Sequence, residues 1–258
     1  MIEGKVIAIT GASSGIGAEI AVELAHRGAV LALFGRNPDG LRTTAARLGS
    51  ATHRQYVLDV TSDEQVRQAV EQVVADFGRI DVWINNAGFG RFARMLDTPI
   101  EDFASMMNAN YMGVVRCTKA VLPHMLLARS GQIVNVASIA GKIGSSKATA
   151  YAASKHAVLG FTNSLRQELA GTGVMITAVN PGPIDTPFLA KADPSGHYVR
   201  NIATYLLKPQ QVARAVAGAI ERRRSHVDLP WIMGFGAKLF ALFPGLFERI
   251  AGGLLNKK

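Results

Sequence analysis

The stretch from Lys5 to Ala25, KVIAITGASSGIGAEIAVELA, restricts the fold more than any other part of the sequence. It begins with a short apolar run, Val6 to Ile9, of the kind found in parallel strands that are buried on both faces. A glycine-rich turn follows at Thr10 to Gly17, and apolar residues then recur at helical spacing as far as Leu24. The pattern predicts a strand, a tight turn and a helix, which together are the first unit of an α/β fold.

Three glycines shape this turn. Gly11 permits the change of direction, while Gly15 and Gly17 remove Cβ atoms where a phosphate or the sheet must come close. The free N–H groups and the positive dipole at a helix N-terminus favour an anion, so a pyrophosphate group fits this position. The spacing differs from G-x-G-x-x-G, the commonest dinucleotide-binding pattern, so an ordinary strand-to-helix turn is the alternative.

The rest of the chain alternates apolar strands with amphipathic helices. The predicted strands are 6–9, 30–34, 55–58, 81–84, 132–136 and 174–179, and the predicted helices after the first include 63–77, 103–127 and 151–169. This alternation predicts an α/β protein with a single Rossmann-type doubly wound parallel sheet and helices on both faces. A chain of 258 residues, 48% of them apolar, suits one dinucleotide-binding and catalytic domain over 1–258.

Composition limits the partners and the compartment. The net charge of +9 suits anionic partners such as phosphorylated cofactors, acidic substrates or lipid, but the basic residues are dispersed apart from Arg222 to Arg224. The sequence has no pattern typical of a recognition helix and no interleaving of aromatic and basic residues, so we expect no nucleic-acid binding. A single cysteine, Cys117, excludes an intramolecular disulfide, and the six histidines lack metal-ligand spacing. Because the first residues enter a strand without an apolar leader, we expect a cytoplasmic protein. The spacing of the histidines leads us to expect no bound metal.

Unusual residues follow the predicted strands at their carboxyl ends, which is where doubly wound sheets bind ligands. These segments are Gly11–Gly17, Arg36, Asp59, Asn85–Gly88, Ser138 and Pro181–Thr186. Because parallel strands all end at the same edge of a sheet, we expect the segments to converge there.

Tyr151 and Lys155 are four residues apart on a predicted helix, so their side chains share one face. An ammonium beside a phenol stabilises the phenolate, so we expect Lys155 to lower the pKa of Tyr151 from its ordinary value of about 10. Tyr151 could then act as a general acid for a carbonyl oxygen or as a base for an alcohol, with Ser138 donating a hydrogen bond to the same oxygen. The alternatives are a surface tyrosine beside a solvated lysine, and a serine that only shapes its turn.

Taken together, these motifs resemble the classical short-chain dehydrogenase/reductase family. The similar segments are TGASSGIG at Thr10–Gly17, NNAG at Asn85–Gly88, Asn110, Ser138, Y-x-x-x-K at Tyr151–Lys155 and PGPIDT at Pro181–Thr186. The resemblance extends over about Lys5 to Pro187 and accounts for the departure from G-x-G-x-x-G. It implies a hydride-transfer enzyme that acts on a small-molecule carbonyl or alcohol substrate and forms a homo-oligomer, either a dimer or a tetramer.

The resemblance also implies roles for individual residues. Tyr151 would be the acid/base and Ser138 would polarise the substrate carbonyl, while Lys155 would bind the nicotinamide ribose and Asn110 would hold a water that relays protons. The other cofactor-binding residues that it implies are Gly11, Ser13, Ser14, Gly15, Ile16, Gly17, Asp59, Val60, Asn86, Ala87, Gly88, Pro181, Gly182, Ile184 and Thr186.

The residues after the second strand bear on the choice between NADP(H) and NAD(H). An NAD site uses a carboxylate there to bind the ribose 2′-hydroxyl, whereas a 2′-phosphate favours a cation. Gly35 takes the place of the acid and Arg36 follows it, which favours NADP(H) and leaves NAD(H) as the second choice. Ser14 stands where many relatives have another basic residue, so we expect moderate discrimination. Asp39 lies too far into the loop to replace the carboxylate, and an exposed loop charge is the alternative role for Arg36.

Residues 188–207 are predicted to form a substrate lid. The candidate wall residues within it are Phe188, His197, Tyr198 and Tyr205, and Gly90, Phe92, Ile139 and Ile143 would extend the same wall. No cluster of charged residues in this segment identifies a substrate. The C-terminal segment at 229–258 resembles those of lipid- or steroid-directed members of the family, which implies an apolar ketone or aldehyde as substrate. An NAD-linked alcohol dehydrogenase is the alternative within enzymes.

Residues 229–258 form a hydrophobic C-terminal extension. Pro244, several glycines and scattered charges interrupt it, which argues against a segment that spans a bilayer. Three interpretations stay open: a flap over an apolar substrate pocket, an oligomer contact, or a peripheral contact at the inner membrane face. The last of these also leaves open a non-catalytic, NADP-binding regulatory protein at a membrane.

Overall fold

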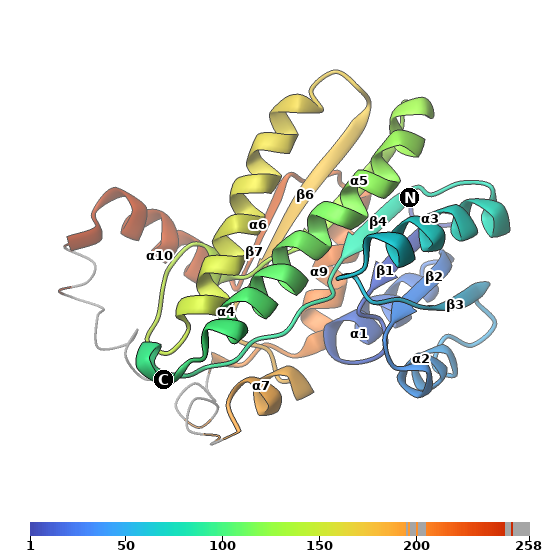
Figure 1. The fold of residues 1–258 in the computed structure, drawn as a ribbon. Helices are drawn as coiled ribbons and strands as arrows, with labels where there is room; N and C mark the ends of the chain where they lie inside the picture. The colour runs from blue at the N-terminus through green and yellow to red at the C-terminus, as the bar shows by residue number, and fades with distance from the viewer. Residues whose placement is uncertain (195, 197–199, 201–204, 246–248, 250–258) are drawn as a thin grey trace.

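Seven parallel strands form one sheet in the computed structural model, which describes residues 1–194, 196, 200, 205–245 and 249 (Figure 1). The strands are β1 (Val6–Thr10), β2 (Val30–Gly35), β3 (His53–Val57), β4 (Val82–Asn85), β5 (Gly131–Val136), β6 (Val174–Pro181) and β7 (His226–Leu229). Their order is β3-β2-β1-β4-β5-β6-β7, and each neighbouring pair is parallel. The order reverses between β1 and β4, and sheets of this topology bind ligands at that reversal.

Helices cover both faces of the sheet (Figure 1). The helices on one face are α1 (Gly15–Ala25), α2 (Pro38–Ala45) and α9 (Pro209–Glu221), and those on the other are α3 (Asp63–Phe77), α5 (Gly113–Leu127) and α6 (Thr149–Glu168). All of β1 is buried: Ile7 and Ile9 belong to the core on the α1 side, and Val6 and Ala8 to the core on the α3 side. Successive strand residues point to opposite faces, so this double burial explains the uninterrupted apolar run. The predicted Rossmann-type sheet is confirmed.

Helix α3 has the bounds that the sequence predicts, because its end signals are local. The Ser62 hydroxyl accepts a hydrogen bond from the Gln65 N–H at 3.3 Å, which caps the N-terminus. Asp63 and Glu64 lie in the first turn, where the helix dipole favours negative charge. Gly78 ends the helix with a φ of 76°, a left-handed conformation that glycine adopts at little cost.

The predicted helix over 103–127 is wrong in its continuity. The structure contains α4 (Ile100–Met107), a π-helical turn (Asn108–Met112) and then α5. Apolar residues continue across the turn, so their spacing does not reveal it. The turn brings Asn110 against the backbone of Phe89, whose N–H and carbonyl both bond to the Asn110 amide at 2.9 Å. Turns of this kind are common at functional sites.

Two further elements escaped prediction. Helix α2 begins after Asn37, whose side chain accepts hydrogen bonds from the N–H groups of Asp39 and Gly40 at 3.0 and 3.2 Å. Strand β7 extends the sheet beside β6, and α10 (Trp231–Leu242) follows it and projects at the left of Figure 1. Helix α2 has 8 residues and β7 has 4, so each is too short for its pattern of apolar residues to identify it.

The predicted lid falls partly within the described residues. Its first part forms α7 (Pro187–Ala192), and Tyr205 is also described, whereas His197 and Tyr198 lie outside the described residues. Among the helices within the described ranges, none is long and apolar enough to cross a membrane.

Candidate active site

A cavity of about 840 Å³ lies at the carboxyl ends of the strands. Its wall brings together most of the residues that the sequence predicts for the site. Those in the wall are Gly11, Ser13, Ser14, Gly15, Ile16, Arg36, Asp59, Val60, Asn86, Ala87, Gly88, Ser138, Tyr151, Lys155, Pro181, Gly182, Ile184 and Thr186. Gly17 and Asn110 stand behind the wall and support it.

The two ends of the glycine turn, Gly11 and Gly17, lie in close contact. Gly11 and Gly15 have φ values of +69° and +56°, which side chains rarely tolerate. A Cβ on Gly17 would lie 2.2 Å from the Gly11 carbonyl oxygen, so the third glycine provides room for the backbone of the turn itself. Ser14 caps α1 without a side-chain hydrogen bond, and the first turn of α1 has no acidic residue. The helix N-terminus therefore offers the cavity unpaired N–H groups and a positive dipole, which fits a pyrophosphate.

Asn86 and Thr10 connect the glycine turn to the end of β4. The Asn86 amide donates to the carbonyls of Thr10 and Gly11 at 3.0 and 3.3 Å, and the Thr10 hydroxyl accepts from the N–H groups of Asn86 and Ala87 at 3.0 and 3.1 Å. These contacts fix the floor of the cavity. Asn86 has a supporting part in addition to the predicted contact with a ribose.

Arg36 and Asp59 lie in the wall beyond β2 and β3. Partial burial acts to raise the pKa of Asp59, but hydrogen bonds from Thr61 and the charge of Arg36 outweigh it and lower that pKa. A Cβ on Gly35 would stand 3.0 Å from the Ser13 Cβ, so a side chain at that position is crowded. Asp39 is exposed and forms an ion pair with Arg42. Among the described residues, the segment directly after β2 therefore contributes Arg36 to the cavity wall and no carboxylate.

Tyr151, near the start of α6, packs against two phenylalanine rings that also contact each other. Its ring centroid is 5.8 Å from that of Phe92 and 5.6 Å from that of Phe188, and Gly90 leaves room beside it. This apolar enclosure raises the pKa of Tyr151 to about 12 through desolvation, although a hydrogen bond with Ser138 acts to lower it. The phenol thus stays protonated at neutral pH.

Lys155 does not bring the pKa of Tyr151 below its ordinary value, because desolvation raises that pKa, so the predicted net lowering is wrong for this structure. Its ammonium lies 5.8 Å from the centroid of the tyrosine ring and donates to the Val136 carbonyl at 2.9 Å. Burial dominates both groups: it lowers the pKa of Lys155 to about 8 and raises that of Tyr151. Among the described residues the ammonium has Val136 as its hydrogen-bond acceptor, which leaves N–H donors for ribose hydroxyls.

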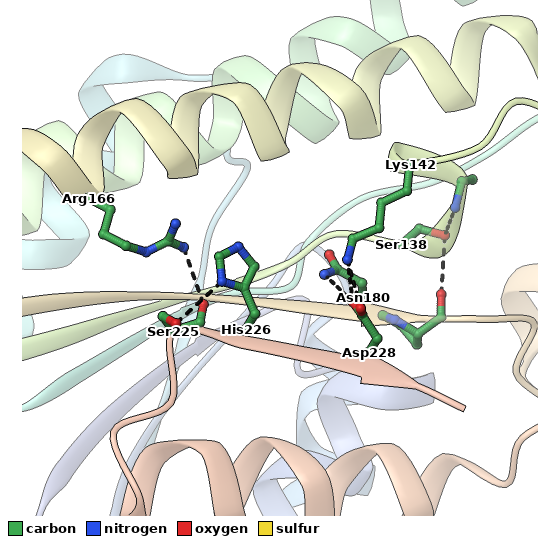
Figure 2. Close-up of polar contacts among 9 residues, drawn as sticks. Ser138, Lys142, Arg166, Asn180, Ser225, His226 and Asp228 are labelled. Carbon is green, nitrogen blue, oxygen red and sulfur yellow. Dashed lines mark hydrogen bonds and ion pairs between the residues drawn. The ribbon is translucent and has the colours of Figure 1, made fainter. Parts of the chain in front are cut away.

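Ser138 begins a short 3₁₀ turn (Ile139–Gly141) after β5. Its hydroxyl accepts from the Ala140 N–H at 3.0 Å and donates to the Pro181 carbonyl at 3.3 Å (Figure 2). Ser138 therefore shapes its turn, as the alternative interpretation of this residue expected. It also lies in the cavity wall near Tyr151.

Asn110 is buried, and its amide donates to the Ser154 hydroxyl at 3.0 Å in addition to the Phe89 contacts. The Ser154 hydroxyl in turn donates to the Tyr151 carbonyl at 2.7 Å. A Cβ on Gly88 would lie 2.8 Å from the Asn110 Oδ1 atom. Asn110 thus ties α6 to the segment after β4, while the predicted water relay stays a prediction.

Helix α10 and the proline before it provide a section of wall, in the segment for which the sequence left open a flap over the substrate pocket as one of three interpretations. Pro230, Ile232, Met233 and Gly236 all line the cavity, and a Cβ on Gly182 would lie 2.7 Å from the Met233 sulfur. The alternation in HVDL followed by a proline is the signal that could have identified the strand preceding this helix.

The sequence pattern of the short chain dehydrogenases matches residues 5–195. A 3-oxoacyl-[acyl-carrier-protein] reductase of Thermotoga maritima is 42% identical over 193 residues, which cover 74% of this chain and 78% of that protein. Among solved structures, a variant actinorhodin polyketide ketoreductase with NADPH has a TM-score of 0.81 at 33% identity and covers 89% and 97% of the two chains. A short chain dehydrogenase/reductase of Burkholderia phymatum with NAD has a TM-score of 0.88 at 27% identity and covers 95% of each.

The fold and the cavity define a nucleotide-binding oxidoreductase. The chain belongs to the short chain dehydrogenase/reductase family. Because similar structures hold either NADPH or NAD, the comparisons support a nicotinamide cofactor without choosing between the two.

Proposed function

We propose that this protein is an NADP(H)-dependent reductase of uncharged, largely apolar ketones or aldehydes, and in reverse an alcohol dehydrogenase. The observation that carries the proposal is the meeting of Tyr151, Ser138 and Lys155 in a cavity that continues to the glycine turn and Arg36. When bound, the cofactor supplies a hydride. The chain's own residues then position the carbonyl and provide the proton.

In this proposal the substrate carbonyl oxygen accepts hydrogen bonds from the Tyr151 phenol and the Ser138 hydroxyl. These donors stabilise the negative charge that develops on the oxygen, and Tyr151 transfers its proton. Lys155, close to the tyrosine ring, stabilises the phenolate that remains. Phe92 and Phe188 pack against the tyrosine ring and exclude water there, which strengthens these interactions.

Support for an apolar substrate comes from the side of the cavity opposite the glycine turn. The wall residues there are Gly90, Phe92, Ile139, Ile143, Phe188, Leu189, Tyr205, Ile232 and Met233, with Lys191 as the charged member. A screen of aliphatic, aromatic and steroid-like ketones and aldehydes, followed by NADPH oxidation, tests the proposal. Turnover with apolar members supports it, and the absence of turnover with every member contradicts it.

The preference for NADP(H) is tested by Arg36→Ala. A hydrogen bond to a charged group is worth about 1.5–3 kcal/mol, so loss of the 2′-phosphate contact should raise the KM for NADPH by roughly 10- to 100-fold. The KM for NADH should stay nearly constant. Steady-state kinetics with each cofactor measures both effects.

Arg42→Ala is the matched control for Arg36→Ala. Arg42 lies on the neighbouring helix α2, is exposed, and stands outside the cavity wall. It should leave both KM values unchanged. Equal increases for NADPH and NADH in Arg36→Ala would overturn the assignment and favour the NAD-linked alternative.

Reduction should slow as the pH rises through about 8. Burial lowers the pKa of Lys155 to about 8, so its ammonium is present below that pH and lost above it, while Tyr151 keeps its proton to about pH 12. Without the ammonium the phenolate left after proton transfer is less stable, so kcat must fall. The pH dependence of kcat measures this, and Lys155→Arg should remove the transition near pH 8. A wild-type profile that is flat between about pH 7 and 10 would contradict the argument.

The lid at 188–207 and the oligomeric and cytoplasmic states remain parts of this proposal. For the C-terminal extension, the wall contacts of Ile232 and Met233 favour the flap over the other two interpretations. The outer side of α10 exposes Trp231, Phe235 and Leu242, which keeps an oligomer or membrane contact as the second candidate. Vesicle sedimentation of the chain with and without residues 231–258 tests the membrane contact, because binding to vesicles that requires this segment favours that interpretation.

A further inference from the structure

A carboxylate outside the cavity wall, Asp228 on β7, accepts from side chains on two other elements (Figure 2). Lys142 donates to its two oxygens at 2.6 and 2.8 Å, and Asn180 on β6 donates to one of them at 2.8 Å. The ion pair is mostly buried, with 22% of the Lys142 side chain and 17% of the Asp228 side chain exposed. We call Lys142, Asn180 and Asp228 the Asp228 cluster.

The cluster is tied to the Ser138 turn at both ends. Lys142 directly follows the 3₁₀ turn that Ser138 begins, and its N–H donates to the Ile139 carbonyl at 2.9 Å. Asn180 directly precedes Pro181, whose carbonyl accepts from the Ser138 hydroxyl at 3.3 Å. The cluster therefore connects both sides of the Ser138 hydrogen bond, although Ser138 itself does not touch it.

Helix α10 rests on the same carboxylate. A Cβ on Gly234 would lie 2.4 Å from an Asp228 oxygen, so the helix backbone packs directly against this side chain. The neighbouring residue, Met233, lines the cavity and packs against Gly182. Asp228 thus contacts both the residue that follows the Ser138 turn and the helix that provides this part of the substrate wall.

The arrangement of the Asn180 amide depends on Asp228. Asn180 is fully buried, and its Oδ1 atom has no hydrogen-bond partner among the described residues. The Asn180 side chain is therefore held by its Nδ2–H group, which donates a hydrogen bond to the Asp228 carboxylate. Buried polar groups are normally paired, so the unpaired Oδ1 atom is an exception. The hydrogen bond to Asp228 sets the position of the Asn180 side chain in spite of it.

We propose that Asp228, held by Lys142 and Asn180, is a positioning residue that fixes the Ser138 hydroxyl and the α10 wall relative to the substrate carbonyl. The inference rests on the proposed carbonyl reduction. Asp228 acts through other residues: Lys142 sets the end of the Ser138 turn, Asn180 sets the strand that accepts from Ser138, and Gly234 sets α10. Small misplacements of a reacting group slow catalysis strongly.

The test replaces the charges with groups of similar shape, Asp228→Asn and Lys142→Met. Each variant should lower kcat for ketone reduction by about tenfold or more, with an unchanged Kd for NADPH. The double variant should be no slower than the slower single variant, because both changes release the same turn. Lys142→Arg keeps the cation and should restore most of the lost kcat. Lys142→Met carries the test if Asp228→Asn does not fold.

The ion pair between Arg27 and Glu221 is the matched control. It joins the turn after α1 to the last residue of α9, away from the substrate wall, with 30% and 35% of the two side chains exposed. Arg27→Met and Glu221→Gln should change the melting temperature without changing kcat. The proposal is overturned if the Asp228 cluster variants keep the wild-type kcat, lose kcat and NADPH affinity together, or show additive losses. A wild-type enzyme without turnover is a different result, because it contradicts the proposed function itself.

Discussion

Tyr151→Phe should lower kcat for carbonyl reduction by about 10²- to 10⁴-fold, the usual contribution of a general acid. The substitution removes the phenolic proton and keeps the ring that packs against Phe92 and Phe188. In the proposed function the glycine turn, Arg36 and Lys155 bind the cofactor, so the Kd for NADPH should stay the same. Single-turnover kinetics and a fluorescence titration with NADPH measure the two quantities separately.

Tyr111→Phe is the control for that variant. Tyr111 lies in the π-helical turn and packs edge-on against Phe161, with ring centroids 6.2 Å apart, outside the cavity wall. It should keep the wild-type kcat. A Tyr151→Phe enzyme that retains most of its kcat would refute the assigned acid, and one that also loses NADPH binding would show that the ring has a structural part in the cofactor site.

The sequence predicts those parts of the site whose chemistry is local. Gly11 and Gly15 need positive φ values, and Gly17 needs space beside a carbonyl, so the residue type alone reveals the turn. Tyr151 and Lys155 share a helix face because of their spacing. The convergence of the strand ends follows from parallel pairing, which the alternation of strands and helices already implies.

Long-range packing determines what the sequence does not predict. The pKa of Tyr151 rises because Phe92 and Phe188, distant along the chain, enclose the phenol. The wall from α10 depends on β7, whose four residues pair with β6 only in the folded sheet. In both cases the decisive quantity is burial, which residue spacing on one element does not report.

Because of these long-range contacts, both halves of the sheet contribute residues to the edge where the cavity lies. The β1 to β4 half provides the glycine turn and Asn86, and the β5 to β7 half provides Ser138 and the Asp228 cluster. The halves meet along the β4–β5 pairing, where Asn85 donates to the Asn135 side chain at 2.8 Å. A substitution at the glycine turn should therefore affect cofactor binding while it leaves the substrate half folded.

Gly17→Ala provides that substitution. The new Cβ would lie 2.2 Å from the Gly11 carbonyl oxygen, a backbone atom that cannot rotate away, so the turn or the helix must move. Overpacking of this kind costs about 1–3 kcal/mol of folding free energy. If the turn absorbs the movement, NADPH affinity should fall by roughly 10- to 100-fold, since each 1.4 kcal/mol is a factor of ten. Calorimetric titration with NADPH and a thermal melt measure the two effects.

Gly160→Ala is the control, because Gly160 lies within α6 and a Cβ there would meet no atom within 4 Å. Alanine favours a helix interior by about 1 kcal/mol over glycine, so this variant should melt at a higher temperature with unchanged NADPH affinity. The same propensity acts at position 17, which means that any loss there comes from the close contacts of the new Cβ with Gly11 and with the Asn86 Nδ2 atom at 2.6 Å. Wild-type affinity in Gly17→Ala would show that the turn adjusts freely, and the close backbone contact would then have no part in binding the cofactor.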